Sequence, residues 1–263
     1  MHQLEQGNRR RQWRGRRIRE SGPVRQLLSG LVAFGLVTGA FWTAPRWLVP
    51  HLATWSPRCL YHVPTRDRVV ALTIDDGPDP AYTPEIVQLL DEHGARATFF
   101  LISGHVPGAD SIVTDLVARG HELANHLTRD EPSIRLSPAA FGVAIREADR
   151  VLSRFSSLRW LRPGGGWYTG TMLDTLERAG YRCALGSVYP YDGGATWPPL
   201  AAAYILANTR PGAIIVLHEG DARGARAVSI LRRVLPELRA RGYRLVTLSE
   251  LVALAERAGS PRS

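Results

Sequence analysis

The stretch ALTIDDGPDP, residues 71 to 80, ends an apolar run with two adjacent carboxylates, Asp75 and Asp76. Like charges held close together repel each other, so such a pair needs a positive partner such as a metal ion or an arginine. Asp, Gly and Pro are also ordinary turn formers, and in isolation the stretch favours a simple turn. The polar residues elsewhere in the chain decide between the two interpretations.

The composition is that of a globular protein. The chain has 263 residues, of which 44% are hydrophobic and 22% are charged, enough for one large domain and an appendage. Its two cysteines, Cys59 and Cys183, are too few for a disulfide framework and lack a metal-binding spacing. They could pair outside the cytoplasm or remain free thiols, and the sequence leaves both possibilities open.

The N-terminal part combines a basic head with an apolar segment. Residues 1–25 hold eight arginines and two glutamates, and Leu27 to Pro45 carries no charge. A run of this length crosses a bilayer core of roughly 30 Å, and arginines on one flank keep that flank in the cytoplasm. We therefore expect a cytoplasmic head (1–26), a single-pass transmembrane signal anchor (27–45), a stem (46–66) and a domain outside the cytoplasm at the cell membrane.

Other interpretations of this region remain open. A cleavable signal peptide would place TGA, residues 38–40, at the cleavage site, and the arginines weakly resemble a twin-arginine export signal. A nucleic-acid-binding arm would explain the arginines but not the apolar run beside them, so we expect no nucleic-acid partner. A buried helix of a soluble protein is the remaining alternative.

From residue 67 onward, short apolar segments alternate with amphipathic ones. This alternation occurs at least six times and predicts a parallel sheet covered by helices, either doubly wound or closed into a small barrel. The clearest expected strands are 68–74, 97–103 and 121–125, and the clearest expected helices are 84–94, 110–120 and 137–155.

Polar residues follow the expected strands. In parallel α/β proteins the functional groups collect at the carboxyl ends of the strands. The residues at these positions are Asp75, Asp76, His126, Asp130, Arg162, Asp192 and His218. Two carboxylates and a histidine could bind one divalent cation, which leaves an arginine and a second histidine for catalysis.

The spacing of His126 and Asp130, four residues apart, would place them on one side of a helical turn. A histidine and a carboxylate suit Zn²⁺ or a similar divalent ion. Three protein ligands and one open position form a catalytic site in which the metal lowers the pKa of a water molecule toward about 7. The spare aspartate could then accept the proton of that water.

Four ordered segments resemble the motifs of the polysaccharide deacetylase family, which is also called the NodB-homology or carbohydrate esterase 4 family. They are TIDDGP, GHELANH, RPGGG and VLH, within residues 67–257. The resemblance implies a distorted (β/α) barrel that removes N-acetyl or O-acetyl groups from polysaccharides with the help of a divalent metal. Zn²⁺ is the preferred ion, with Mn²⁺ or Co²⁺ as alternatives, and an acetylated glycan is the expected partner.

The resemblance also implies a role for each matching residue. The expected roles are Asp75 as general base, Asp76 and His126 as metal ligands, Arg162 as the partner of the base, His218 as general acid, and Leu217 as a substrate contact. Beyond the family pattern, Asp130 is expected as the third metal ligand, and Gly165 with Trp167 or Tyr168 as further substrate contacts.

This sequence departs from the family pattern in three places. The second motif ends in Asp130 where the family has a histidine, and Gly165 replaces a family aromatic residue. The fourth motif is not recognisable, and Asp192 is the candidate for the residue that orients His218. These departures keep a second hypothesis open, namely a non-catalytic carbohydrate-binding or envelope-scaffold protein on the same fold.

Overall fold

The computed structural model describes residues 23–194 and 196–259. The chain divides into two compact units, 1–41 and 42–263. Every candidate site residue lies in the second unit, which begins well before the expected domain boundary at Asp67.

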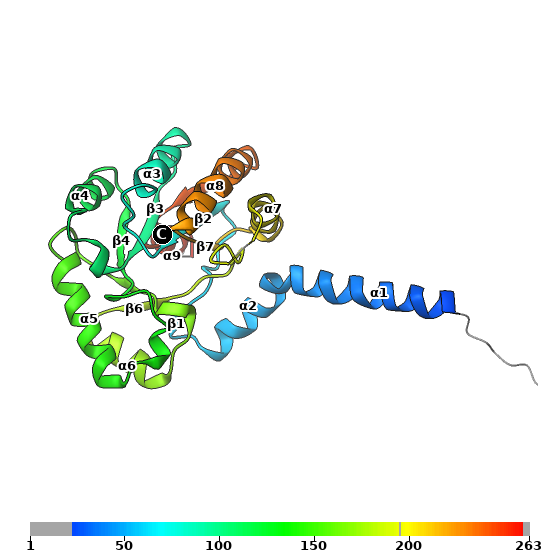
Figure 1. Ribbon diagram of the computed structural model, residues 1–263, viewed down its shortest axis with the longest axis horizontal. Helices are drawn as coiled ribbons and strands as arrows, with labels where there is room; N and C mark the ends of the chain where they lie inside the picture. The colour runs from blue at the N-terminus through cyan, green and yellow to red at the C-terminus, as the bar shows by residue number, and fades with distance from the viewer. Residues whose placement is uncertain (1–22, 195, 260–263) are drawn as a thin grey trace, which may run out of the picture. The chain divides into compact units, whose positions relative to one another are not determined.

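The second unit is built on one curled parallel sheet (Figure 1). The strand order is β1–β6–β5–β4–β3–β2–β7, and β8 also pairs with β2. The strands are β1 (Cys59–Leu60), β2 (Val69–Asp75), β3 (Ala97–Leu101), β4 (Glu122–Asn125), β5 (Trp160–Leu161), β6 (Arg182–Ala184), β7 (Ile214–His218) and β8 (Arg244–Val246). Isolated bridges from His62 to Ala213 and from Val188 to Ile215 draw the two ends of the sheet together. The predicted α/β class and curled barrel-like fold are thereby confirmed.

Helices cover the outside of the curled sheet (Figure 1). They are α3 (Thr83–Glu92), α4 (Asp110–Ala118), α5 (Pro138–Leu152), α6 (Gly170–Arg178), α7 (Pro198–Asn208) and α8 (Ala222–Ala240). The start of α5 follows from its sequence, because Ser137 accepts a hydrogen bond from the amide of Ala140 and Pro138 occupies the first turn. Pro236 lies inside α8.

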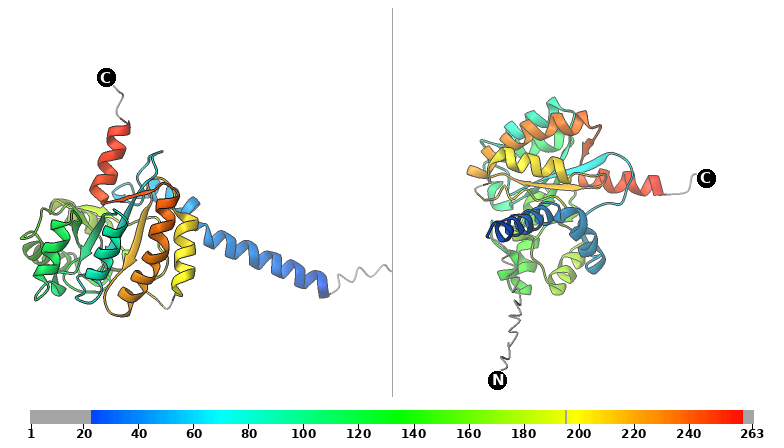
Figure 2. Two further views of the ribbon diagram at one scale, coloured as in Figure 1. Left: turned by 90° about the horizontal axis from the view of Figure 1, so that it is seen from above. Right: turned by 90° about the vertical axis from the view of Figure 1, so that its right-hand side faces the viewer.

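The strands place alternate side chains on the two faces of the sheet. Ile74 and Leu217 face the helix layer and belong to the largest apolar cluster. Ala71, Phe100 and Trp160 face the interior of the curled sheet, where α9 (Leu248–Gly259) packs against them; Figure 2 shows α9 projecting from one end of the domain. The same alternation turns Thr73 and Asp75 of β2 toward the interior.

The N-terminal region differs from the expected anchor and stem. The structure has two helices there, α1 (Pro23–Trp42) and α2 (Ala44–Trp55). The expected anchor, 27–45, therefore runs across the break at Thr43, and the expected irregular stem holds most of α2. The stem residue Val49 is buried and packs in the same apolar cluster as Cys59, so this segment belongs to the folded domain.

No single helix among the described residues is both long and apolar enough to cross a bilayer. The segments Leu27–Ala40 and Ala44–Trp55 meet the length and composition requirement only as a pair.

Candidate active site

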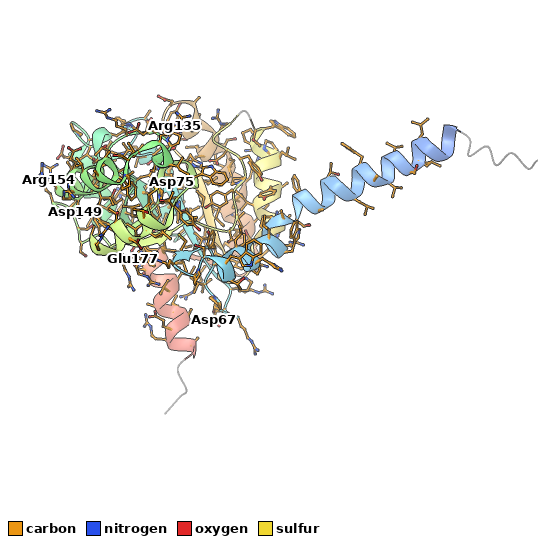
Figure 3. The ribbon with its side chains drawn as sticks, turned by 90° about the horizontal axis from the view of Figure 1, so that it is seen from below. Asp67, Asp75, Arg135, Asp149, Arg154 and Glu177 are labelled. Carbon is orange, nitrogen blue, oxygen red and sulfur yellow. The ribbon has the colours of Figure 1, made fainter. Side chains whose placement is uncertain are left out.

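Asp75 is the last residue of β2 and lies inside the domain (Figure 3), with 2% of its surface exposed. Its Oδ1 accepts a hydrogen bond from Nη1 of Arg162 at 2.5 Å. Arg162 comes directly after β5 and is equally buried, at 2% exposed. Burying two opposite charges carries a desolvation cost, which is offset only when the two groups meet in good geometry. The pair therefore fixes the orientation of the Asp75 carboxylate.

The guanidinium of Arg162 is held from several sides. It donates to Oγ1 of Thr73 at 2.9 Å and to the carbonyl oxygens of Ala184 and Leu185. Its central carbon lies 4.0 Å from the centre of the Phe100 ring, within the range of a cation–π contact. No sequence pattern identifies Phe100 as a site residue, because a phenylalanine inside an apolar strand is also typical of the hydrophobic core.

Asp76 follows Asp75 but also turns into the site. Its φ of +75° interrupts the extended strand, and its amide donates to the carbonyl of Phe100 at 3.1 Å. Aspartate is among the few residues that tolerate this left-handed conformation. Two consecutive carboxylates can therefore face one site, where a continuing strand would have turned them apart.

His126 lies opposite Asp76 and is buried. Its Nδ1 is 2.7 Å from the carbonyl oxygen of Arg162, which can only accept, so Nδ1 carries the proton. Its Nε2 is 3.3 Å from Oδ1 of Asp76. Burial lowers the pKa of His126, but the hydrogen bond to Asp76 and the nearby carboxylates raise it more, and the net shift is upward.

His218 ends β7 and is the register partner of Asp75 in the adjacent strand. Its Nδ1 lies 3.0 Å from Oδ1 of the buried Asp192, and its amide donates to the other oxygen of Asp192 at 2.7 Å. Burial lowers the pKa of His218, but the bond to Asp192 and the charges of the nearby aspartates outweigh it and raise that pKa to about 9. Asp192 therefore lies where it can orient His218 and keep it protonated.

Asp130 does not form a metal site with the other two expected ligands. Among the described residues, no group of three His, Cys, Asp or Glu side chains is arranged to hold a metal ion. Asp130 is half exposed, and its Oδ2 is 2.7 Å from Nη2 of Arg223. The segment from His126 to Asp130 is not the expected helical turn, since Leu127 has a φ of +67°. Asp76 and His126 are thus the two expected ligands that face each other, while Arg223 pairs with both Asp130 and Asp76.

The three expected substrate contacts lie in different environments. Leu217 is fully buried in the helix-facing core, so it does not line the site. Val216, the register partner of Thr73, lies on the site face of β7, as the two-residue period of a strand requires. Gly165 has a φ of +72° in an exposed turn, and Trp167 beside it is 68% exposed.

Glu219, which follows His218, is fully buried. Its Oε2 accepts from Oγ1 of Thr83 at 2.7 Å, and burial raises its pKa to about 8. It packs so closely on the DDGP turn that a Cβ at Gly77 would lie 1.8 Å from its Oε1. This close approach explains the glycine in the turn.

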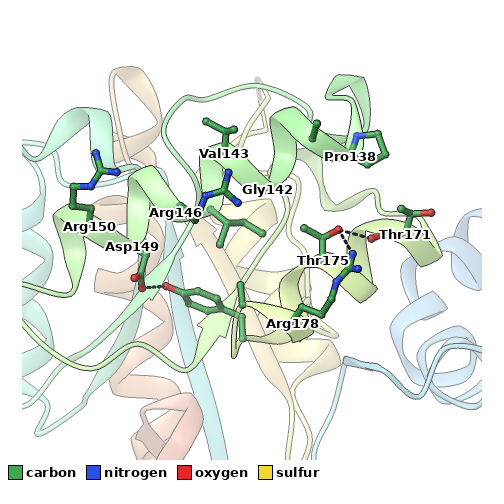
Figure 4. Close-up of a pocket in the computed structure, with 13 residues that line it drawn as sticks. Pro138, Gly142, Val143, Arg146, Asp149, Arg150, Thr171, Thr175 and Arg178 are labelled. Carbon is green, nitrogen blue, oxygen red and sulfur yellow. Dashed lines mark hydrogen bonds between the residues drawn. The ribbon is translucent and has the colours of Figure 1, made fainter.

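A separate concavity of about 920 Å³ lies between α5 and α6 (Figure 4). Its lining includes Arg146, Asp149, Thr175 and Arg178. It contains none of the candidate site residues, so its size does not make it the active site.

Comparison with known proteins gives a consistent result. Residues 62–184 match the family model described as polysaccharide deacetylase. A peptidoglycan-N-acetylglucosamine deacetylase of Bacillus cereus is 32% identical over 195 residues, which cover 73% of this chain and 92% of the relative.

Two solved structures share the fold. A peptidoglycan N-acetylglucosamine deacetylase superposes with a TM-score of 0.72 at 25% identity, covering 76% of this chain and 96% of the other. A family 4 acetyl xylan esterase from Clostridium thermocellum, in complex with a cobalt ion, superposes with a TM-score of 0.66 at 28% identity, covering 71% and 91% of the two chains.

Proposed function

Because this chain belongs to the polysaccharide deacetylase family, we propose that it hydrolyses the acetamide of N-acetylglucosamine units in a cell-envelope glycan. The observation that carries this proposal is the pairing of Asp75 with His218. They are register partners at the carboxyl ends of neighbouring strands, and each has its own buried counter-charge, Arg162 or Asp192. A candidate base and a candidate acid thus lie next to each other at the same rim of the sheet.

Each residue has a definite task in this proposal. Asp75 accepts the proton of the attacking water, and Arg162 holds its carboxylate in place. His218, kept protonated by Asp192, donates a proton to the departing sugar nitrogen, and acetate leaves. A divalent cation held by Asp76 and His126 would acidify the water and polarise the acetyl carbonyl. The N–H of Gly165 would donate to the developing oxyanion, since the N–H groups of Gly164 and Gly166 already donate to Ser133 and to the carbonyl of Pro163.

Acetate release tests this proposal directly. Purified protein supplied with Zn²⁺ or Co²⁺ is expected to release acetate from N-acetylglucosamine oligomers and from peptidoglycan, and chelation is expected to abolish the release. The same panel should include an O-acetylated xylan. Release from the xylan alone would replace the amide substrate with an ester.

A non-catalytic carbohydrate-binding role is the second candidate. It is favoured by the pairing of Asp130 with Arg223, which withdraws an expected metal ligand. This candidate predicts glycan binding without acetate release at any metal concentration, so the same assay separates the two.

We also propose that the N-terminal segment attaches the enzyme to the membrane, with the domain outside the cytoplasm. The support is the basic head and four apolar side chains of α1, Leu27, Leu31, Phe34 and Leu36, each between 64% and 70% exposed. The full chain is expected to sediment with membranes and resist extraction by carbonate, whereas residues 42–263 are expected to stay in the supernatant. Release of the full chain by high salt alone would indicate a merely electrostatic attachment.

The pH dependence of the reaction should reveal the pair of His218 and Asp192. A protonated His218 stabilises the fold fully below pH 6.5, and this stabilisation is lost as the pH rises through about 9. In the pH profile of the reaction, kcat is expected to fall on the alkaline side near the same pH, and this fall is the alkaline limb of the profile. Asp192→Asn keeps an oxygen for the amide of His218 but removes the charge, so the limb should move at least one pH unit toward acid. An unmoved limb in this variant would show that His218 does not act as the acid.

A further inference from the structure

Arg223 connects the two carboxylates expected to bind metal. Its Nη1 lies 2.9 Å from Oδ2 of Asp76, and its Nη2 lies 2.7 Å from Oδ2 of Asp130. One guanidinium therefore neutralises both acids with the forked geometry that suits carboxylates. The positive partner of Asp76 is thus Arg223 of α8, as that of Asp75 is Arg162.

The backbone around Arg223 holds it in this position. It is the second residue of α8, and the two residues before the helix, Gly220 and Asp221, both have positive φ. The amide of Asp221 donates to Oδ2 of Asp79, which ties this loop to the loop after β2. The Arg223 side chain is still 22% exposed, and Asp130 is 50% exposed. The guanidinium can therefore leave toward solvent while its backbone stays in place.

A divalent cation at Asp76 would meet the positive charge of Arg223 at close range. Oδ1 of Asp76 faces His126, and Oδ2 is already taken by Arg223. Like charges a few ångströms apart repel strongly in a partly buried site. Asp130 can turn to a metal only after its own bond to Arg223 is broken.

We infer that Arg223 is a displaceable internal cation that competes with the divalent metal for Asp76 and Asp130. The inference rests on the proposed metal-dependent function. Metal binding then requires the arginine to swing out, and the freed Asp130 becomes the third ligand. The site so regulated has a lower metal affinity than its ligands alone would give.

Metal affinity, measured without reference to activity, tests this inference. Co²⁺ is titrated into the full chain by equilibrium dialysis and visible absorption, for the natural protein, Arg223→Gln and Arg232→Gln. The last is a matched control, because Arg232 also lies on α8 and pairs with an exposed acid, Glu85. Arg223→Gln is expected to bind Co²⁺ at least tenfold more tightly, and Arg232→Gln is expected to match the natural protein.

The role of Asp130 is tested in the same background. Adding Asp130→Asn to Arg223→Gln is expected to remove the gain in affinity, and a retained gain would overturn the assignment of Asp130 as third ligand. Equal or weaker binding by Arg223→Gln would overturn the competition while leaving the hydrolase proposal intact. Absence of Co²⁺ binding in every variant would overturn both the competition and the metal-dependent function.

A second inference concerns the two cysteines. Cys59 of β1 and Cys183 of β6 are register partners in neighbouring parallel strands, and their buried Sγ atoms are 2.8 Å apart. Adjacent strands lie about 4.8 Å apart, within the Cα separation that a disulfide allows. We propose that these thiols form a disulfide that ties the segment after α2 to the sheet.

The oxidation requires a disulfide reagent, here glutathione disulfide. One cysteine thiolate attacks it and releases a first glutathione, and the second thiolate then displaces another, so two electrons pass to glutathione and two thiol protons follow. The reduced, unfolded chain is refolded in a glutathione buffer and mapped by mass spectrometry. A monomer 2 Da lighter with a Cys59–Cys183 peptide is expected. Free thiols, a retained glutathione adduct or a crosslinked dimer would overturn the assignment.

Discussion

Asp75→Asn is expected to lower kcat for acetate release at least a thousandfold while the domain remains folded. The substitution removes the group that takes the proton of water, and asparagine cannot replace it as a base. The amide oxygen can still accept from Arg162, which also keeps its bonds to Thr73 and two carbonyl oxygens. The orientation of the site is therefore retained although its chemistry is lost.

The same substitution has a cost in stability, which has to be measured separately. It leaves the charge of Arg162 buried without its counter-charge, and removing one partner of a buried pair costs about 3–5 kcal/mol. Each kcal/mol lowers Tm by roughly 2–4 °C for a domain of this size. Asp174→Asn, at an exposed ion pair with Arg58, is the matched control and should leave both activity and Tm nearly unchanged. An Asp75→Asn variant that kept a tenth of the activity would exclude Asp75 as the base.

His218→Ala is expected to affect amide and ester substrates differently. A sugar amine leaves only with a proton, so loss of the general acid should cost about 10²–10⁴ in kcat on N-acetylglucosamine oligomers. A nitrophenolate leaves without a proton, so the loss on 4-nitrophenyl acetate should stay below about tenfold. The ratio of the two losses reports proton donation and not folding.

The control for this variant is His93→Gln, because His93 lies at the C-terminal end of α3 and belongs to none of the site contacts described above. It should leave both reactions unchanged. If His218→Ala reduced both reactions by the same factor, His218 would be acting on a step that the two substrates share, such as the attack of water.

Much of the domain follows from local pattern. Runs such as 69–75 are apolar throughout because both faces of the strand are covered, and this pattern is visible in the sequence. Parallel order then brings the carboxyl ends to one rim, so the proximity of Asp75, Arg162, His126 and His218 was predictable from their positions after strands. The two-residue period of a strand also predicts that Val216, and not Leu217, faces the site.

Local pattern along the chain therefore specifies the type of fold and the set of residues at its rim, whereas the contacts among these residues depend on the folded chain. The direction of Asp76 depends on one positive φ, and the partner of Asp130 is an arginine 93 residues further along the chain. The burial of Glu219 depends on the turn at Gly77. Strand period fixes side-chain direction only within a strand. Beyond its end, direction is set by loop dihedrals and by charges that only the folded chain brings together.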